Sequence, residues 1–183
     1  MGYELALVKA YLELESLTSE KKFSVKLLAD EYEVGLENKR IFSLACNVPA
    51  KDYLGVLLLH YLIRKVKGLP SLKGAWISFR QLPGGEGYFP AFTKRVIQPL
   101  LRKYKDNPER LLELTKRFKA EREGYPDLSI SLEVLERVPF LITLQRGDEE
   151  FTPLANLLFD GSIKDIFSTE DVVVLSEFVA RNI

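Results

Sequence analysis

One segment of the sequence, residues 50–67, is apolar on nearly every side, and it constrains the fold more than any other. If the segment is a helix, it has two apolar stripes. One consists of Tyr53, Leu57, Tyr61 and Leu62, and the other of Val56, Leu59 and Ile63. Pro49 precedes the segment, and Gly68 follows it, where helices commonly end. A helix that is apolar all round must be covered all round. We therefore predict a central helix against which the rest of the chain packs.

The size and composition of the chain fit one domain. Its 183 residues are 46% hydrophobic, which is enough to bury a sizeable core, so we predict a single domain over residues 1–183. This apolar content excludes a disordered chain. No apolar run approaches the roughly 18–20 residues that cross a bilayer, so we predict no membrane. Because the N-terminus has neither the basic region nor the cleavage site of an export signal, we expect a cytoplasmic protein.

Periodicity along the chain predicts alternating helices and hairpins. We expect helices over residues 3–17, 50–67, 90–104, 108–121 and 169 onward, and strands over 32–36, 40–46, 75–82, 128–134 and 138–144. Pro99 must kink or interrupt its helix, and Ser168 with Asp171 resembles a capping box. We predict an α+β fold, in which the central and flanking helices pack on a largely antiparallel sheet of two hairpins plus the 75–82 strand.

The net charge of zero hides two segments of opposite charge. Residues 94–122 carry ten basic and four acidic side chains, and residues 127–183 carry eleven acidic and four basic ones. Two interpretations stay open, namely mutual attraction of the two segments or ordinary solvated faces. A neutral chain steers weakly toward phosphate, so we do not expect nucleic-acid binding.

The most unusual segment is residues 76–89, which contains three glycines within four positions. Amides in such a turn, just before a helix, are able to converge on an anion, with Arg80 as a bidentate partner and an aromatic wall beside it. The segment matches neither a phosphate loop nor a dinucleotide fingerprint. The competing interpretation is a plain turn with its aromatic side chains in the core. The candidate ligand-binding residues are His60, Trp76, Arg80, Gly84, Gly85, Tyr88 and Phe89.

His60 is the single histidine of the chain, and it lies within the central helix. A catalytic imidazole needs an orienting partner, for which the acidic candidates are Glu149, Glu150 and Asp160. These carboxylates also suit a hard cation, a helix cap or solvent. No spacing indicates a metal site. The lone Cys46 excludes an internal disulfide or a thiolate cage, and we expect it to be a small buried apolar group rather than a nucleophile.

Three stretches together carry a family resemblance. They are residues 57–62, residues 76–85 continuing to Ala91-Phe92, and Glu149-Glu150-Phe151 with Leu158-Phe159-Asp160. Their order and separation resemble the prokaryotic family called domain of unknown function 3786, over most of the chain from the first hairpin onward. Its relatives occur in anaerobic bacteria and archaea, some joined to a four-cysteine iron–sulfur domain that this chain does not contain. The resemblance implies single-domain integrity and brings no reaction and no catalytic residues.

Two functions follow as expectations. The first is a non-catalytic accessory protein that binds a small anionic or aromatic ligand. Because some relatives are joined to an iron–sulfur domain, the resemblance also implies a role beside anaerobic redox or corrinoid metabolism, with an iron–sulfur or corrinoid partner protein. The alternative is a hydrolase or transferase that uses His60 with the acidic candidates. The sequence identifies no cofactor and no oligomeric state.

Overall fold

The computed structural model describes residues 2–124, 128–147 and 150–183. The α-helices are α1 (Glu4–Leu17), α2 (Asp52–Lys67), α3 (Gly85–Phe92), α4 (Gln98–Tyr104) and α5 (Thr169–Asn182). The strands are β1 (Lys22–Leu27), β2 (Asp30–Gly35), β3 (Arg40–Ser43), β4 (Val48–Pro49), β5 (Trp76–Ser78), β6 (Ala120–Arg122), β7 (Leu128–Leu135), β8 (Val138–Gln145) and β9 (Leu154–Asp160). Segments of 3₁₀ helix cover Phe79–Gln81, Pro108–Lys116 and Gly161–Asp165.

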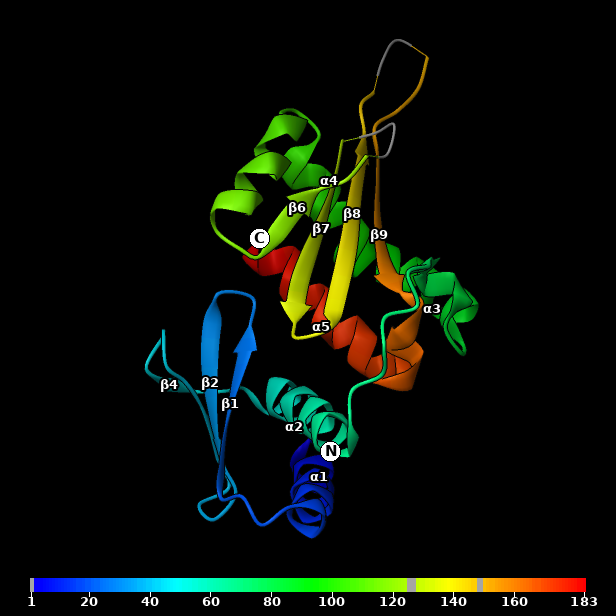
Figure 1. Ribbon diagram of the computed structural model, residues 1–183. Helices are drawn as coiled ribbons and strands as arrows, with labels where there is room; N and C mark the ends of the chain where they lie inside the picture. The colour runs from blue at the N-terminus through cyan, green and yellow to red at the C-terminus, as the bar shows by residue number, and fades with distance from the viewer. Residues whose placement is uncertain (1, 125–127, 148–149) are drawn as a thin grey trace.

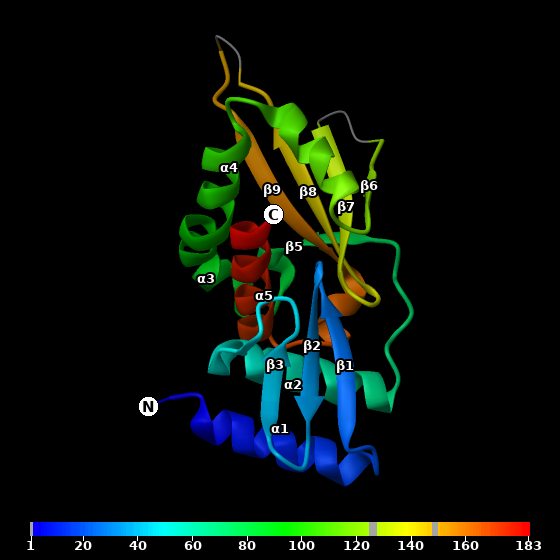
Figure 2. The ribbon, with the colours of Figure 1, turned by 90° about the vertical axis from the view of Figure 1, so that its left-hand side faces the viewer.

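The strands form two antiparallel sheets, one in each half of the chain. The first has the order β1-β2-β3-β4 and lies beside α1 and α2 (Figure 1). The second has the order β5-β9-β8-β7-β6, and α4 and α5 lie on one of its faces (Figure 2). A backbone hydrogen bond of 2.8 Å, from the Leu28 amide to the Val134 carbonyl, joins the turn after β1 to the end of β7. The two halves therefore meet where α2 also lies.

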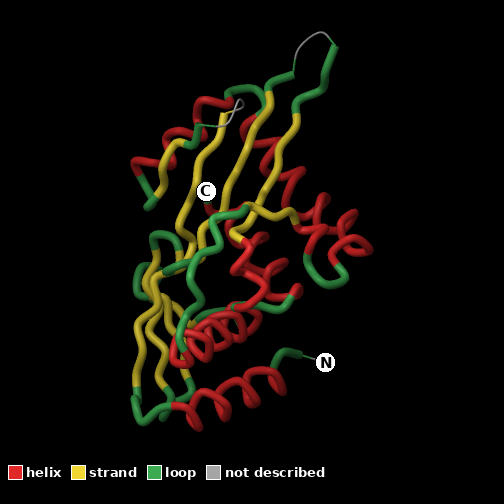
Figure 3. Tube along the Cα trace, turned by 45° about the vertical axis from the view of Figure 1, so that its right-hand side comes forward, coloured by secondary structure: helices red, strands yellow, loops and turns green. Residues whose placement is uncertain are grey.

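Helix α2 has the central place that its sequence predicts. Its buried residues are Leu54, Gly55, Val56, Leu57, Leu58, Leu59, Tyr61, Leu62 and Ile63. A Cβ atom placed on Gly55 would lie 3.1 Å from Leu7 of α1 and 3.3 Å from Ile41 of β3, so both elements press closely on α2. On its other side the Tyr61 hydroxyl donates to the carbonyl of Glu136, in the turn between β7 and β8. Both halves thus cover α2 (Figure 3).

The α+β class, the antiparallel hairpins and the capping box at Ser168 are confirmed. The strands divide into two sheets, however, instead of the one sheet that we expected. Strand β1 was not predicted, although its apolar residues alternate. Side chains on its polar face contact β2 through the pairs Lys22–Glu33 and Ser24–Glu31. Strand β9 also escaped prediction, because it lies inside the sheet and its apolar run Leu157-Leu158-Phe159 does not alternate.

Two local predictions differ from the structure, and a third is confirmed. The strand expected over 75–82 stops at Ser78, where a capping box turns the chain into a 3₁₀ segment. The helix expected over 108–121 is a 3₁₀ segment followed by β6. The helix around Pro99 is interrupted as predicted, and a π-helical turn, Thr93–Ile97, precedes the proline, which has no amide hydrogen for the helical ladder.

Ion pairs join the two segments of opposite charge. Arg95 lies 3.3 Å from Glu177 of α5, and Lys119 lies 2.7 Å from Glu133 of β7. These contacts fit the first interpretation of the charge pattern, mutual attraction of folded segments. Within the described residues no helix is long and apolar enough to cross a membrane.

The burial of α2 gives a stability prediction. Leu58 is 0% exposed, so Leu58→Ala removes a fully packed side chain and should lower the free energy of unfolding by about 2–5 kcal/mol in urea denaturation. The matched control is Leu12→Ala on α1, where the side chain is 55% exposed and a change within about 0.5 kcal/mol is expected. Equal losses in both variants would contradict the central position of α2.

Candidate functional site

The glycine-rich segment folds as a compact turn that leads into α3. The Ser78 amide and hydroxyl both bond the Gln81 side chain, and the Leu82 amide donates to the Phe79 carbonyl at 3.1 Å. Gly84 has a φ of +71°, a conformation that favours glycine, and it is the N-cap of α3. Gly85 has an ordinary φ, but a Cβ atom there would lie 2.0 Å from the Phe79 carbonyl oxygen. Gly84 and Gly85 thus each have a structural reason of their own.

Arg80 has its partners inside this same segment. Its guanidinium lies 2.5 Å from the Glu86 carboxylate and 4.0 Å from the centroid of the Phe89 ring. Trp76 lies on β5, opposite Asp160 in the register with β9. The arrangement therefore fits a turn stabilised by its own side chains. The competing interpretation also expected the aromatic side chains in the core, and Tyr88 is instead 38% exposed.

His60 pairs with Asp171, a residue that the sequence analysis selected only as part of a helix cap. The Nδ1 atom of His60 lies 3.0 Å from each carboxylate oxygen of Asp171, on α5. The same carboxylate accepts hydrogen bonds from the Ser168 hydroxyl at 2.8 Å and the Ser168 amide at 3.2 Å. Asp171 is buried, whereas the His60 side chain is 37% exposed. The capping box thus fixes the carboxylate that joins α5 to α2.

The hydrogen bond to Asp171 is the largest influence on the pKa of His60. It raises that pKa above its ordinary value, burial opposes the shift, and the charges of Asp171 and Glu13 add to it. The protonated, cationic form of the imidazole is therefore favoured beside the carboxylate in the folded protein.

Among the described residues, the partner of His60 is Asp171 and not one of the acidic candidates. Asp160 accepts the backbone amides of Lys73 (2.9 Å), Gly74 (2.8 Å) and Ser162 (2.9 Å), so it fixes the loop that leads into β5. Burial alone would raise the pKa of Asp160, but its hydrogen bonds to Ser162 and to the amides lower it. Glu150 is exposed in the connection between β8 and β9, and Glu149 lies outside the described residues.

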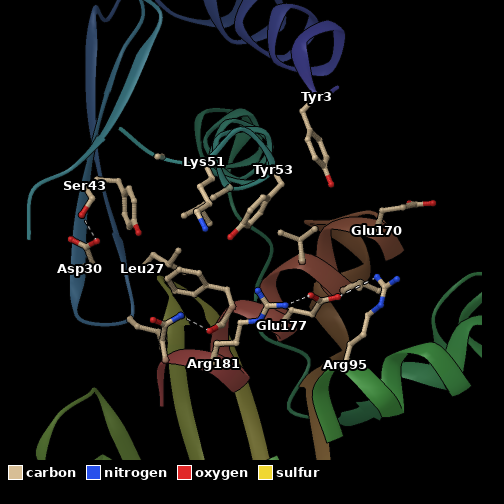
Figure 4. Close-up of a pocket in the computed structure, with 18 of the residues that line it drawn as sticks. Tyr3, Leu27, Asp30, Ser43, Lys51, Tyr53, Arg95, Glu170, Glu177 and Arg181 are labelled. Atoms are coloured by element: carbon tan, nitrogen blue, oxygen red, sulfur yellow. Dashed lines mark hydrogen bonds and ion pairs between the residues drawn. The ribbon is translucent and has the colours of Figure 1, made fainter. Parts of the chain in front are cut away.

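A cleft of about 1000 Å³ lies between the two halves, near the start of α2 (Figure 4). Its walls come from the segment before α1, the connections β1–β2 and β3–β4, the starts of α2 and α3, the π-helical turn and α5. Six aromatic residues line it: Tyr3, Tyr32, Tyr53, Tyr88, Phe118 and Phe178. Figure 4 shows the side chains of Tyr3, Lys51 and Tyr53 pointing toward Glu177 and Arg181 on the opposite wall. The cleft is thus both aromatic and charged.

Most of the acidic groups in the cleft are already paired. Glu177 lies between Arg95 and Arg181, at 3.3 and 3.2 Å. Asp30 accepts the Ser43 hydroxyl at 2.6 Å and the Ala45 amide at 3.1 Å. Lys51 and Arg117 also line the cleft, and neither forms an ion pair in the part of the chain that the structure describes. They are the cations available to a ligand.

Of the predicted site residues, Gly84 and Tyr88 line the cleft, and His60, Trp76, Arg80, Gly85 and Phe89 do not. Cys46 lines it too and is exposed, so the expectation of a buried cysteine is wrong. The physical reason is that β3 ends at Ser43 and places Cys46 in the following turn. Among the described residues, no group of three or more His, Cys, Asp or Glu side chains is placed to hold a metal ion.

The close approach at Gly85 gives a second prediction. Gly85→Ala should destabilise the protein by about 1–3 kcal/mol, because its Cβ atom meets a backbone oxygen that moves only with the whole turn. Gly87→Ala is the matched control in the same helix, because nothing lies within 4 Å of its Cβ position; it should be neutral or stabilise by up to about 1 kcal/mol. Urea denaturation compares the two, and a loss in both would refute the distinction.

The His60–Asp171 pair gives a third prediction, on pH. Because the pKa of His60 is raised on folding, the pair stabilises the protein fully below the unfolded value of about 6.5. That stabilisation is lost as the pH rises through the raised pKa of the folded protein. His60→Gln should remove this part of the pH dependence, measured as the difference from wild type in urea denaturation. NMR titration of the single histidine provides the check, and a pKa at or below 6.5 would contradict the pairing.

Comparison with curated proteins and with solved structures gives no match. A family model does match, over residues 8–182, which is nearly the whole chain. This confirms the resemblance inferred from the sequence. The protein belongs to the family described as Domain of unknown function (DUF3786).

Proposed function

We propose that this protein is a binding module that holds a small anionic molecule with a flat, apolar part in the cleft between its two halves. The observation that carries the proposal is the coexistence of aromatic walls with two cations, Lys51 and Arg117, that have no carboxylate partner in the described structure. Small-molecule sites are commonly concave, largely apolar and equipped with a few polar groups that fix orientation.

The aromatic walls support a flat ligand. Tyr3 and Tyr53 lie with ring centroids 6.3 Å apart, and both line the cleft. Tyr88 lies on the α3 side, where the Arg95 guanidinium is 5.8 Å from its ring centroid. Planar molecules gain contact area on such rings at little conformational cost, and the phenolic hydroxyls add hydrogen-bonding groups. A ligand of this kind would bridge the two halves of the protein.

The charges support an anion. Since Arg95 and Arg181 share Glu177, their charges are largely compensated, whereas those of Lys51 and Arg117 are not. A carboxylate or phosphate gains charge-assisted hydrogen bonds from such groups. The same proposal includes a role beside anaerobic redox or corrinoid metabolism. This part rests on the resemblance alone, because some relatives are joined to iron–sulfur domains.

The enzyme hypothesis has less support. It needs His60 beside a carboxylate in an open cleft, and His60 does have such a partner in Asp171. The histidine does not line the cleft, however, and its described hydrogen bonds are those to Asp171 alone. The imidazole therefore lacks a neighbouring group on which it would act as an acid or base.

A fourth prediction tests the proposed function. Protein purified without oxygen should retain a small molecule in native mass spectrometry, and Lys51→Gln should lose it while its unfolding free energy changes by no more than about 0.5 kcal/mol. Lys9→Gln on α1 removes the same charge from an exposed residue that does not line the cleft, and it should keep the ligand. The proposal would be contradicted if the wild-type protein had only the mass of its polypeptide, or if both variants lost the retained molecule to the same extent.

A further inference from the structure

Two arginines share one carboxylate on the wall of the cleft that α5 forms. Oε1 of Glu177 accepts a hydrogen bond of 3.3 Å from Nη1 of Arg95, in the π-helical turn, and Oε2 accepts one of 3.2 Å from Nη2 of Arg181. We call these three residues the Glu177 triad. All of them line the cleft, and Figure 4 shows the carboxylate between the two guanidinium groups. The Glu177 side chain is only 20% exposed, against 53% for Arg95 and 68% for Arg181, so the carboxylate is the anchored member of the triad.

Most hydrogen-bond donors of the two arginines are not used by the Glu177 triad. A guanidinium group has five N–H donors, and within the described residues each of the two donates a single hydrogen bond, the one to Glu177. The Arg95 guanidinium also lies 5.8 Å from the centroid of the Tyr88 ring, an aromatic wall of the cleft. Sharing one carboxylate therefore compensates the charge of one guanidinium group but leaves the other donors of both available to a ligand.

The side chains that line the cleft leave one positive charge uncompensated. Within the described residues, four of them are cations and three are carboxylates: Lys51, Arg95, Arg117 and Arg181, against Asp30, Glu170 and Glu177. A ligand with one negative charge therefore neutralises the cleft. A phosphate monoester carries about 1.5–2 negative charges at neutral pH, so it exceeds this balance and is repelled more strongly by the carboxylate of the Glu177 triad.

We propose that the ligand is a flat aromatic molecule with a single carboxylate, which the remaining donors of Arg95 and Arg181 bind while Glu177 holds the two guanidinium groups in place. This inference rests on the proposed function and narrows its anion to a monocarboxylate. Planar guanidinium groups match a carboxylate in a bidentate manner. Glu177 is a positioning residue, because it acts on the ligand only through the two arginines. The rings of the ligand lie toward Tyr3 and Tyr53, on the opposite wall of the cleft.

The fifth prediction uses naphthoate as the probe, with protein that has been dialysed free of any retained molecule. Isothermal calorimetry should show one equivalent bound. Naphthamide, which has the same rings and no charge, and naphthyl phosphate should each bind at least about tenfold more weakly. Arg95→Gln and Arg181→Gln should each raise the Kd of naphthoate by about tenfold or more, because each removes charge-assisted hydrogen bonds. Arg95→Lys should raise this Kd as well, since an ammonium group lacks the planar fork of a guanidinium group.

Glu177→Gln separates positioning from simple charge by the sign of its effect. The substitution keeps the shape of the side chain and leaves one more positive charge uncompensated, so charge alone would tighten the binding of naphthoate. Loss of positioning instead raises the Kd of naphthoate, by about tenfold for two displaced guanidinium groups. The Kd of naphthamide should stay within about twofold, because the amide gains no charge-assisted bond from the arginines. A general distortion of the cleft would weaken the binding of both probes.

Glu170→Gln is the matched control for Glu177→Gln. Glu170 also lies on α5 and lines the cleft, and it forms no ion pair in the part of the chain that the structure describes. The substitution removes the same charge without releasing an arginine. Its Kd for naphthoate should therefore fall or stay within about twofold of the wild-type value, as expected for an exposed charge without a direct contact.

Three results would overturn the inference. They are the absence of saturable naphthoate binding by the wild type, binding of naphthyl phosphate at least as tight as that of naphthoate, and tighter naphthoate binding by Glu177→Gln. A molecule without a carboxylate, retained by the wild type in native mass spectrometry, would also overturn this inference, and it would leave the proposed function intact. By contrast, a wild-type protein that retains no molecule at all contradicts the proposed function itself.

Discussion

The burial of α2 is the constraint on which the rest of this fold depends. An apolar helix of this kind is stable only when every side is covered, and neither sheet covers it alone. Helix α1 and β3 pack on it from the N-terminal half, while α5 and the turn between β7 and β8 contact it from the other half. The position of the two sheets relative to each other follows from this shared burial. The cleft opens at the start of α2, where Lys51 and Tyr53 leave the core and face α5.

His60 is the one residue on the middle of α2 that is not buried, and its pairing with Asp171 gives this apolar helix a directional contact. Apolar packing alone tolerates small rotations of a helix, whereas a buried carboxylate loses its partner if α2 turns or slides against α5. We infer that the pair sets the register between the two helices. On this inference, the histidine of the enzyme hypothesis has a structural role, because it holds α2 and α5 in register and both helices contribute residues to the cleft.

Periodicity in the sequence was enough to predict what local interactions decide: α1, α2, both hairpins and the cap at Ser168. It was not enough for β9, because a strand inside a sheet is apolar on both faces and shows no alternation. The candidate site was harder still. His60 and Asp171 are 111 residues apart, and the cleft draws its walls from segments between Tyr3 and Asn182. Only Gly84 and Tyr88 of the predicted ligand-binding residues line it, since convergence of distant segments leaves no local pattern.

The net charge of the chain is a poor guide to the charge at a ligand-binding site. Ion pairs with the acidic segment, residues 127–183, neutralise part of the excess positive charge of residues 94–122. Examples are Arg95–Glu177 and Lys119–Glu133. Among the described residues, Arg117 is left without an ion pair, and it lines the cleft. Screening in salt limits the field of an exposed charge to roughly 8–10 Å, so distant acidic residues do not cancel it there. A net charge of zero is therefore compatible with the local positive potential that the proposed function requires at this side chain.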